Sequence, residues 1–136
     1  MFICTANSCR SQMAEGLARE LGKGLIESYS AGFMATEVHP NAITVMNEIG
    51  IDISKQNSKI IEDTTLRKTD VVITLCSKAE KYCPVLPSEI RHIHWPIRDP
   101  VLTRGNEELI TNDFRRARDE IKEKIQDFIN SLKSEL

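Results

Sequence analysis

Short apolar runs alternate with amphipathic segments along the chain. Residues 1–4 (MFIC) are apolar, and residues 70–75 (DVVITL) form a β-branched run without alternation, as in a strand that is buried on both faces. Residues 25–32 (LIESYSAG) and 91–95 (RHIHW) predict two further short strands, the first of them ending at Gly32. The pattern therefore predicts four strands distributed over the length of the chain.

Segments with helical spacing separate these strands. From Ser11 onward, apolar residues recur at helical spacing for about three turns. Residues 39–50 (HPNAITVMNEIG) carry a proline suited to the first turn of a helix and a glycine suited to its end. Residues 58–68 show a weaker helical pattern, and from about residue 106 apolar residues follow in steps of three and four, which predicts a long amphipathic helix. Strands alternating with helices predict an α/β fold, a parallel sheet with helices on both faces.

Length and charge exclude several function classes. The chain has 136 residues, and we expect one domain, residues 1–136, that is large enough to bury a core. With 18 basic and 20 acidic residues, the net charge of -2 indicates no broad positive surface for nucleic acid or for an anionic membrane. No apolar run approaches the roughly 20 residues of a membrane span, and no secretion signal is evident. We expect a cytoplasmic monomer with no nucleic-acid or membrane partner.

Four cysteines carry the candidate chemistry: Cys4, Cys9, Cys76 and Cys83. In a reducing compartment, cysteines serve as metal ligands or reactive thiols more often than as structural disulfides. The two histidines of "RHIH" alternate along a strand, where both rings usually share one face for packing. We therefore expect reactive thiols and no metal site.

Residues 4–11 (CTANSCRS) form the connection between the first strand and its helix. In a parallel α/β sheet, ligands bind at the carboxyl ends of the strands, where this connection lies. Such a loop directs backbone N–H groups and the positive end of a helix dipole inward, which makes an oxyanion site. The predicted oxyanion-binding loop consists of Thr5, Ala6, Asn7, Ser8, Cys9, Arg10 and Ser11.

Each polar side chain of this loop has an expected role. Arg10 offers a bidentate fork that matches a tetrahedral oxyanion, and the local field favours the thiolate of Cys4, the candidate nucleophile. Asn7 and Ser8 would hold the shape of the loop, and Ser11 would donate to the Cys4 sulfur. We interpret Cys9 as a small packing residue. In the plain alternative, Cys4 is a buried thiol and Arg10 a surface charge.

Motifs over nearly the whole chain resemble those of a known family. The segments "CTANSCRSQMAEG", "YSAG", "HPNA", "IGIDIS", "VVITLC", "CP" and "HWPIRDP" occur in the order found in thioredoxin-coupled arsenate reductases, which share the fold of low-molecular-weight protein tyrosine phosphatases. The resemblance implies a three-layer domain with a four-stranded parallel sheet. It also implies arsenate or a related tetrahedral oxyanion in the loop, Cys4 as nucleophile, thioredoxin as partner and reductant, and no bound cofactor.

Displacement of hydroxide from arsenate requires a proton donor, for which Asp99 in "RDP" is the candidate. Pro100 restricts the aspartate to extended backbone forms, although Asp-Pro is also an ordinary turn dipeptide. The resemblance favours the catalytic role. Phosphatases of this fold commonly carry a tyrosine after the pair, whereas this chain has Val101, which disfavours a phosphoprotein substrate.

Cys76 directly follows the predicted third strand, so it should lie near Cys4 at the same edge of the sheet. Across a helix, residues seven apart are separated by about 10.5 Å along the axis, whereas a disulfide allows about 7 Å between Cα atoms. A bond between Cys76 and Cys83 would thus require this segment to unwind. Spacing alone leaves two structural cysteines as the simpler reading, but the resemblance implies a relay in which Cys4 attacks arsenic, Cys76 attacks Cys4 and Cys83 attacks Cys76.

The chain departs from the family pattern in two places. Only three residues precede Cys4, so either the first strand is short or the natural start lies upstream. Some family members bind potassium through groups that correspond to Asn7, Glu15, Ser30 and an aspartate, whose place Lys59 holds here. There are two alternatives for Lys59: its ammonium takes the place of the potassium ion, or its side chain points into solvent. We expect no potassium requirement.

Two other functions remain open at this stage. A low-molecular-weight phosphatase would need Cys4, Arg10 and Asp99 but neither later cysteine. A non-catalytic module that binds arsenite or a soft metal would use several thiols and would keep its ligand through gel filtration.

Overall fold

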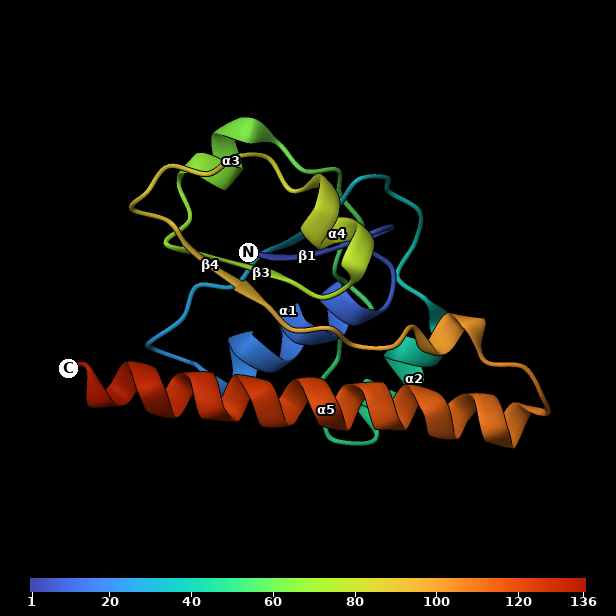
Figure 1. Cartoon of the computed structure of the whole chain (residues 1–136). Helices are drawn as coiled ribbons and strands as arrows, with labels where there is room; N and C mark the ends of the chain where they lie inside the picture. The colour runs from blue at the N-terminus through green and yellow to red at the C-terminus, as the bar shows by residue number, and fades with distance from the viewer.

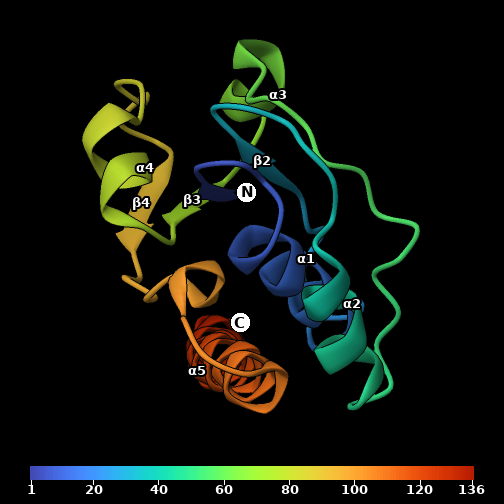
Figure 2. The ribbon, with the colours of Figure 1, turned by 90° about the vertical axis from the view of Figure 1, so that its right-hand side faces the viewer.

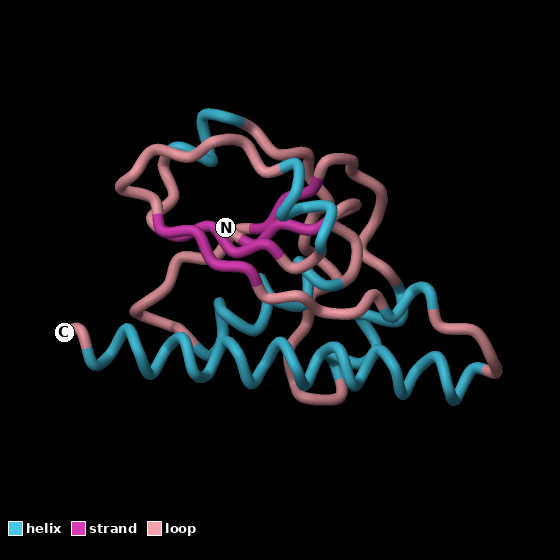
Figure 3. Tube along the Cα trace, in the orientation of Figure 1, coloured by secondary structure: helices cyan, strands magenta, loops and turns pink.

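The four predicted strands form one parallel sheet in the order β2-β1-β3-β4. In the computed structural model, which describes residues 1–136, the strands are β1 (Phe2–Cys4), β2 (Ser30–Gly32), β3 (Val71–Thr74) and β4 (Arg91–His94). Cys4 pairs with Gly32, and Thr74 pairs with both Ile3 and His94. Because every pairing is parallel, the carboxyl ends of all four strands lie at one edge of the sheet, which Figure 3 shows in magenta.

Helices cover both faces of the sheet, which confirms the predicted three-layer α/β fold. They are α1 (Arg10–Leu21), α2 (Pro40–Asn47), α3 (Asp63–Arg67), α4 (Ser77–Tyr82), the short 3-10 helix η1 (Pro100–Leu102) and α5 (Glu107–Ser134). Figures 1 and 2 show α1 and α5 on one side of the sheet and α3 and α4 on the other. The side with α4 is the one that carries the second pair of cysteines.

The long helix predicted from residue 106 is α5. Its inward stripe, Phe114, Ala117, Ile121 and Ile125, is fully buried against the other helices and the sheet. Asn106 caps the helix, because its side-chain oxygen accepts the N–H of Leu109 at 2.9 Å. Burial of each large apolar side chain contributes about 1.5–3 kcal/mol, so this stripe is a main source of stability.

The weaker helical prediction for residues 58–68 is wrong over its first half. Only Asp63–Arg67 is helical, whereas the chain before it is extended and forms a bridge between Ile60 and Gly32. Gly32 donates to the carbonyl of Lys59 and accepts from the N–H of Ile61, each at 2.9 Å. Pairing with the edge of β2 occupies the backbone groups that a helix would have needed.

Glycine ends the second predicted helix as expected. Regular helix stops at Asn47, and the chain turns at Gly50, whose φ of 78° is in the left-handed region that glycine tolerates. At the other end, the ring of His39 accepts the N–H of Asn41 at 3.1 Å. The limits of α2 are thus fixed by local chemistry that the sequence displays.

Candidate active site

The loop between β1 and α1 lies where all four strands end. Its closest neighbour is Gly32 on β2, where a Cβ atom would come within 2.7 Å of the Asn7 nitrogen and 2.8 Å of the Thr5 oxygen. Only glycine permits so close a backbone approach. Asn7 itself has a φ of 48°, a left-handed conformation that asparagine tolerates better than most residues. The loop is therefore held in one strained, compact shape.

The backbone of this loop is polarised. Every carbonyl of residues 5–9 accepts at least one hydrogen bond. The carbonyl of residue 5 accepts from the N–H groups of residues 33 and 34, and those of residues 8 and 9 accept from the N–H groups of residues 39 and 13. The carbonyls of residues 6 and 7 accept from the side chains of Ser58 and Gln12. None of the N–H groups of residues 5–9 donates to an acceptor in the protein. Consecutive free N–H groups in a loop that precedes a helix form a concave site for an anion.

The Cys4 thiol lies 2.8 Å from the hydroxyl of Ser11 and is 3% exposed. The amide nitrogen of Asn7 donates to Ser11 Oγ at 2.8 Å and to Ser30 Oγ at 2.9 Å. Because that nitrogen can only donate, the Ser11 oxygen acts there as acceptor and keeps its own proton for the Cys4 sulfur. The bond thus has the direction that stabilises a thiolate.

Two glutamines hold Asn7 in place, and the sequence analysis missed both. The amide of Gln12, which is fully buried, donates to the backbone oxygen of Asn7 at 3.0 Å and to its side-chain oxygen at 2.9 Å. Gln56 donates in turn to the backbone and side-chain oxygens of Gln12 at 3.0 and 2.8 Å. This network supports the left-handed backbone of Asn7 from beneath the loop.

Arg10 and Asp99 meet at the opening of the loop. One guanidinium nitrogen of Arg10 donates to the carbonyl of Ile97 at 2.9 Å, and another lies 3.3 Å from a carboxylate oxygen of Asp99. The other oxygen of Asp99 accepts the N–H of Val101 at 3.0 Å. Arg10 is buried and Asp99 is partly exposed, so the carboxylate stands between the guanidinium and solvent.

Asp113 on α5 fixes the segment that carries Asp99. It accepts hydrogen bonds from Arg98 at 2.7 Å, from Arg116 at 2.9 Å and from the hydroxyl of Thr103. These bonds, with that of Arg116 foremost, lower the pKa of Asp113 to about 2. No sequence pattern indicates this cluster, because its members are spread over 19 residues with no common spacing.

Cys76 lies beside the loop, as its position after β3 predicts. Its sulfur is 3.4 Å from the hydroxyl of Thr5, the residue that follows Cys4, and it accepts the N–H of Ala79 at 3.3 Å. Cys76 therefore caps the start of α4. A second buried thiol thus lies beside the residue that follows Cys4.

Cys83 stands at the other end of α4, so the segment between the two cysteines is helical. It is half-buried, and all four cysteines are free thiols. Burial, followed by the nearby charge of Glu80, raises the pKa of the Cys83 thiol. Burial also raises the pKa of Cys9 well above its ordinary value, with the charge of Asp99 adding to the effect, which agrees with a packing role.

The four residues expected around a cation lie together at the back of the loop. The ammonium of Lys59 is 3.6 Å from a carboxylate oxygen of Glu15 and donates to the carbonyl of Asn57 at 2.6 Å. The same Glu15 oxygen accepts the hydroxyl of Ser30 at 2.6 Å, and Ser30 is bound by Asn7. The Lys59 side chain is 43% exposed, yet its charged end faces Glu15.

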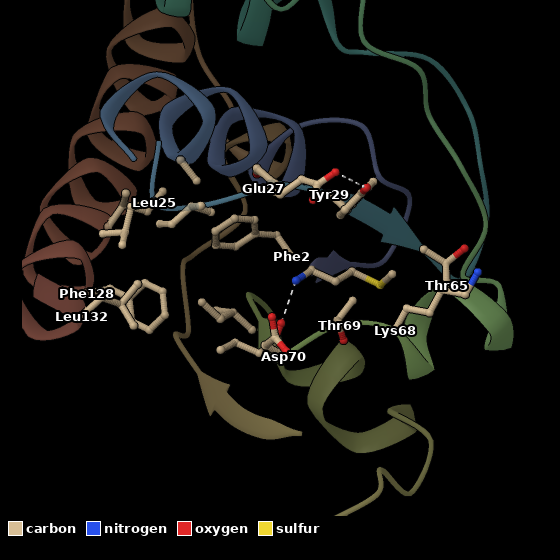
Figure 4. Close-up of a pocket in the computed structure, with 17 residues that line it drawn as sticks. Phe2, Leu25, Glu27, Tyr29, Thr65, Lys68, Thr69, Asp70, Phe128 and Leu132 are labelled. Atoms are coloured by element: carbon tan, nitrogen blue, oxygen red, sulfur yellow. Dashed lines mark hydrogen bonds between the residues drawn. The ribbon is translucent and has the colours of Figure 1, made fainter. Parts of the chain in front are cut away.

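A cavity of about 590 Å³ lies away from this chemistry. Figure 4 shows it at the opposite ends of the strands, between Phe2, Tyr29, Asp70 and Phe128. No candidate site residue lines it.

No group of three or more His, Cys, Asp or Glu side chains is arranged to hold a metal ion. None of the helices combines the length and apolar character needed to cross a membrane.

Comparison with known proteins agrees with this geometry. The family model described as low molecular weight phosphotyrosine protein phosphatase matches residues 1–136. An arsenate reductase of Halalkalibacterium halodurans is 46% identical over 97% of this chain and 95% of its own. A solved arsenate reductase in a phosphate-binding state has 40% identity and a TM-score of 0.78, with 97% of this chain and 96% of that chain covered. A thioredoxin-dependent arsenate reductase of Corynebacterium glutamicum has 27% identity and a TM-score of 0.79, over 99% of this chain and 61% of that one. The chain belongs to the low molecular weight phosphotyrosine protein phosphatase family and, within it, to the arsenate reductases.

Proposed function

We propose that this enzyme reduces arsenate to arsenite through a relay of three thiols that thioredoxin regenerates. The observation that carries the proposal is the position of Cys76. Its buried thiol contacts the hydroxyl of Thr5, the residue that follows Cys4 in the chain. A phosphatase of this family needs one thiol at the loop, whereas a reductase needs a second one within reach. Cytoplasmic location and a monomeric state are part of the proposal.

The first step uses the loop. Arsenate binds to the free N–H groups of residues 5–9 and to the guanidinium of Arg10. The Cys4 thiolate, stabilised by Ser11, attacks arsenic and forms a sulfur–arsenic bond. Asp99 protonates the departing hydroxide, which leaves as water. Its carboxyl group is next to Arg10, at the open side of the loop, where a leaving oxygen would stand.

The second half transfers two electrons. The Cys76 thiolate attacks the Cys4 sulfur, the sulfur–arsenic bond breaks, and its electron pair stays with arsenic, which leaves as arsenite. The Cys83 thiolate then attacks Cys76, forms the second disulfide and releases Cys4 as a thiolate. The dithiol of thioredoxin reduces this last disulfide, and α4 re-forms between the two thiols.

Arsenate-dependent NADPH oxidation with thioredoxin and thioredoxin reductase tests the relay. We expect turnover in the wild type and none in Cys76→Ser. We expect Cys83→Ser to release about one arsenite per chain and to stop with a disulfide between Cys4 and Cys76, which peptide mapping detects. Sustained thioredoxin-linked turnover in Cys76→Ser would refute the proposal.

Hydrolysis of phosphate esters is a second candidate activity, favoured by the family model and by the pairing of Arg10 with Asp99. Val101 is 48% exposed, and its small side chain offers little surface for stacking on a phosphotyrosine ring. We therefore expect slow hydrolysis of p-nitrophenyl phosphate that persists in Cys76→Ser. A protein that only binds arsenite would show neither reaction and would instead retain arsenite at a fixed ratio through gel filtration.

A further inference from the structure

Helix α4 has few contacts of its own to keep it folded. It contains six residues, which is far below the length at which an isolated helix is stable in water. Ala79 is its only buried residue, and Tyr82 at its end is 57% exposed. The sulfur of Cys76 caps its first turn. The hydrogen bond that joins a side chain of the helix to the sheet comes from Glu80.

Glu80 reaches back from α4 to two strands. One of its carboxylate oxygens accepts the hydroxyl of Thr74, at the end of β3, at 2.6 Å. The same oxygen lies 3.2 Å from Nε2 of His92 and 3.2 Å from Nδ1 of His94, both on β4. The hydroxyl of Thr74 is also 2.9 Å from Nδ1 of His94. A single carboxylate thus joins α4 to β3 and β4.

The relay would remove the other restraint on α4. Once the Cys76 sulfur is bonded to Cys4, it is a poorer acceptor for the N–H of Ala79 at the start of the helix. The final bond then requires Cys76 and Cys83 to approach within about 7 Å, measured between Cα atoms, which the helix prevents. At that stage the contacts of Glu80 are the principal side-chain interactions that still oppose unwinding.

We propose that Glu80, with Thr74, His92 and His94, is a positioning latch that holds α4 folded in the dithiol enzyme and opens when the 76–83 disulfide forms. The inference rests on the proposed relay. Glu80 does not touch the reacting atoms in this role. It sets how readily Cys83 reaches Cys76, and how readily thioredoxin reduces the product.

The direction of the effect follows from the step itself. The Cys83 thiolate bonds to Cys76, the 4–76 disulfide breaks, and Cys4 leaves as a thiolate, so no outside oxidant is needed. Contacts made only in the dithiol form stabilise that form and make the disulfide easier to reduce. Loss of the latch therefore favours the disulfide. Burial, followed by the charge of Glu80, raises the pKa of the Cys83 thiol, so removal of that charge also speeds the attack by favouring the attacking thiolate.

The test compares Glu80→Gln and His92→Gln with Glu89→Gln, a matched change at an exposed carboxylate outside the cluster. In full-length protein carrying Cys4→Ser, the 76–83 pair is equilibrated with glutathione buffers and mapped by mass spectrometry. For Glu80→Gln we expect the oxidation constant to rise three- to tenfold, which for a two-electron couple is a reduction potential lower by about 15–30 mV. His92→Gln should shift it less, in the same direction, and Glu89→Gln should not shift it.

A single turnover with Cys4 intact and without thioredoxin separates the steps. We expect Glu80→Gln to form arsenite at the wild-type rate but to form the 76–83 disulfide several times faster. A potential and a rate equal to those of Glu89→Gln would overturn the latch. Slower arsenite formation would also overturn it, because Glu80 would then support the site as a whole. If no variant, nor the parent protein, forms a 76–83 disulfide, the relay itself is wrong.

Discussion

Replacement of Ser11 by alanine tests how the loop activates its nucleophile. The hydroxyl of Ser11 is 2.8 Å from the Cys4 sulfur, and Asn7 orients it by donating to its oxygen. A hydrogen bond to a charged group contributes about 1.5–3 kcal/mol. Each 1.36 kcal/mol is a factor of ten in rate, so the attack of Cys4 should slow by about 10- to 150-fold in Ser11→Ala.

The same substitution also destabilises the protein, which calls for a matched control. Ser11→Ala leaves one amide hydrogen of the buried Asn7 without a partner, which costs about 1–3 kcal/mol of unfolding free energy. Ser30→Ala leaves the other amide hydrogen of Asn7 unpaired and also removes the hydroxyl that donates to Glu15, at a similar total cost, but Ser30 has no hydrogen bond with Cys4. The two variants should melt at similarly lowered temperatures.

The assay is arsenite release in a single turnover at low arsenate concentration, with thermal melting measured in parallel. Ser11→Ala should be slow in the chemical step, whereas Ser30→Ala should stay within a few-fold of the wild type. Equal rate losses in the two variants would refute the reasoning, because the effect would then come from loop distortion rather than from the bond to Cys4.

Three further outcomes follow from the site. Asp99→Asn should lower kcat by about 100- to 10,000-fold, because it removes the proton donor, and it should not weaken oxyanion binding, because it also removes the negative charge beside Arg10; steady-state kinetics would show this. Potassium should not raise the melting temperature of the wild type above that in sodium at equal ionic strength, whereas it should stabilise Lys59→Ala, in which the oxygens of Glu15 and Ser30 lose their ammonium. The pKa of Asp113 is lowered to about 2, so its stabilising effect is present above pH 4 and is lost as the pH falls toward 2. Thermal melts between pH 5 and 2.5 should therefore be flatter for Asp113→Asn than for the wild type.

The pattern of apolar residues was sufficient to predict the elements whose burial follows a simple rule, with one face buried in a helix or both faces in a strand. The stripe through Phe114, Ile121 and Ile125 predicted α5, and consecutive burial of Val72 and Ile73 matches the strand that was expected to be covered on both faces. The pattern failed for residues 58–62, because backbone pairing with the edge of β2 overrides a weak helical preference there. Such pairing depends on which edge is near, and local spacing carries no information about that.

The sequence indicated the positions of the residues in and beside the loop, but not those of the residues that support the loop from other elements. Cys4, Arg10 and Cys76 are placed by a strand end or a helix start, which the sequence reveals. Gln12 acts through contacts with residues far along the chain. Asp113 lies in line with the buried stripe of α5, but spacing does not reveal its pairing with Arg98 and Thr103 outside the helix. The prediction for the histidines of β4 was partly right: both rings share a face, but they bind Glu80 there rather than serve apolar packing.

The environments of the thiols give the proposed relay its order. Cys4 stands at the start of the loop that binds the oxyanion, with the hydroxyl of Ser11 at its sulfur, so it reacts first. Burial raises the pKa of Cys9, which keeps a second loop thiol from competing for arsenic. Burial likewise raises the pKa of Cys83, and α4 holds it away from Cys76, so the last thiol becomes reactive only when its own helix unwinds. A disulfide between Cys76 and Cys83 formed too early would consume the thiol that arsenate reduction requires, and this arrangement suppresses that reaction until Cys76 has already attacked Cys4.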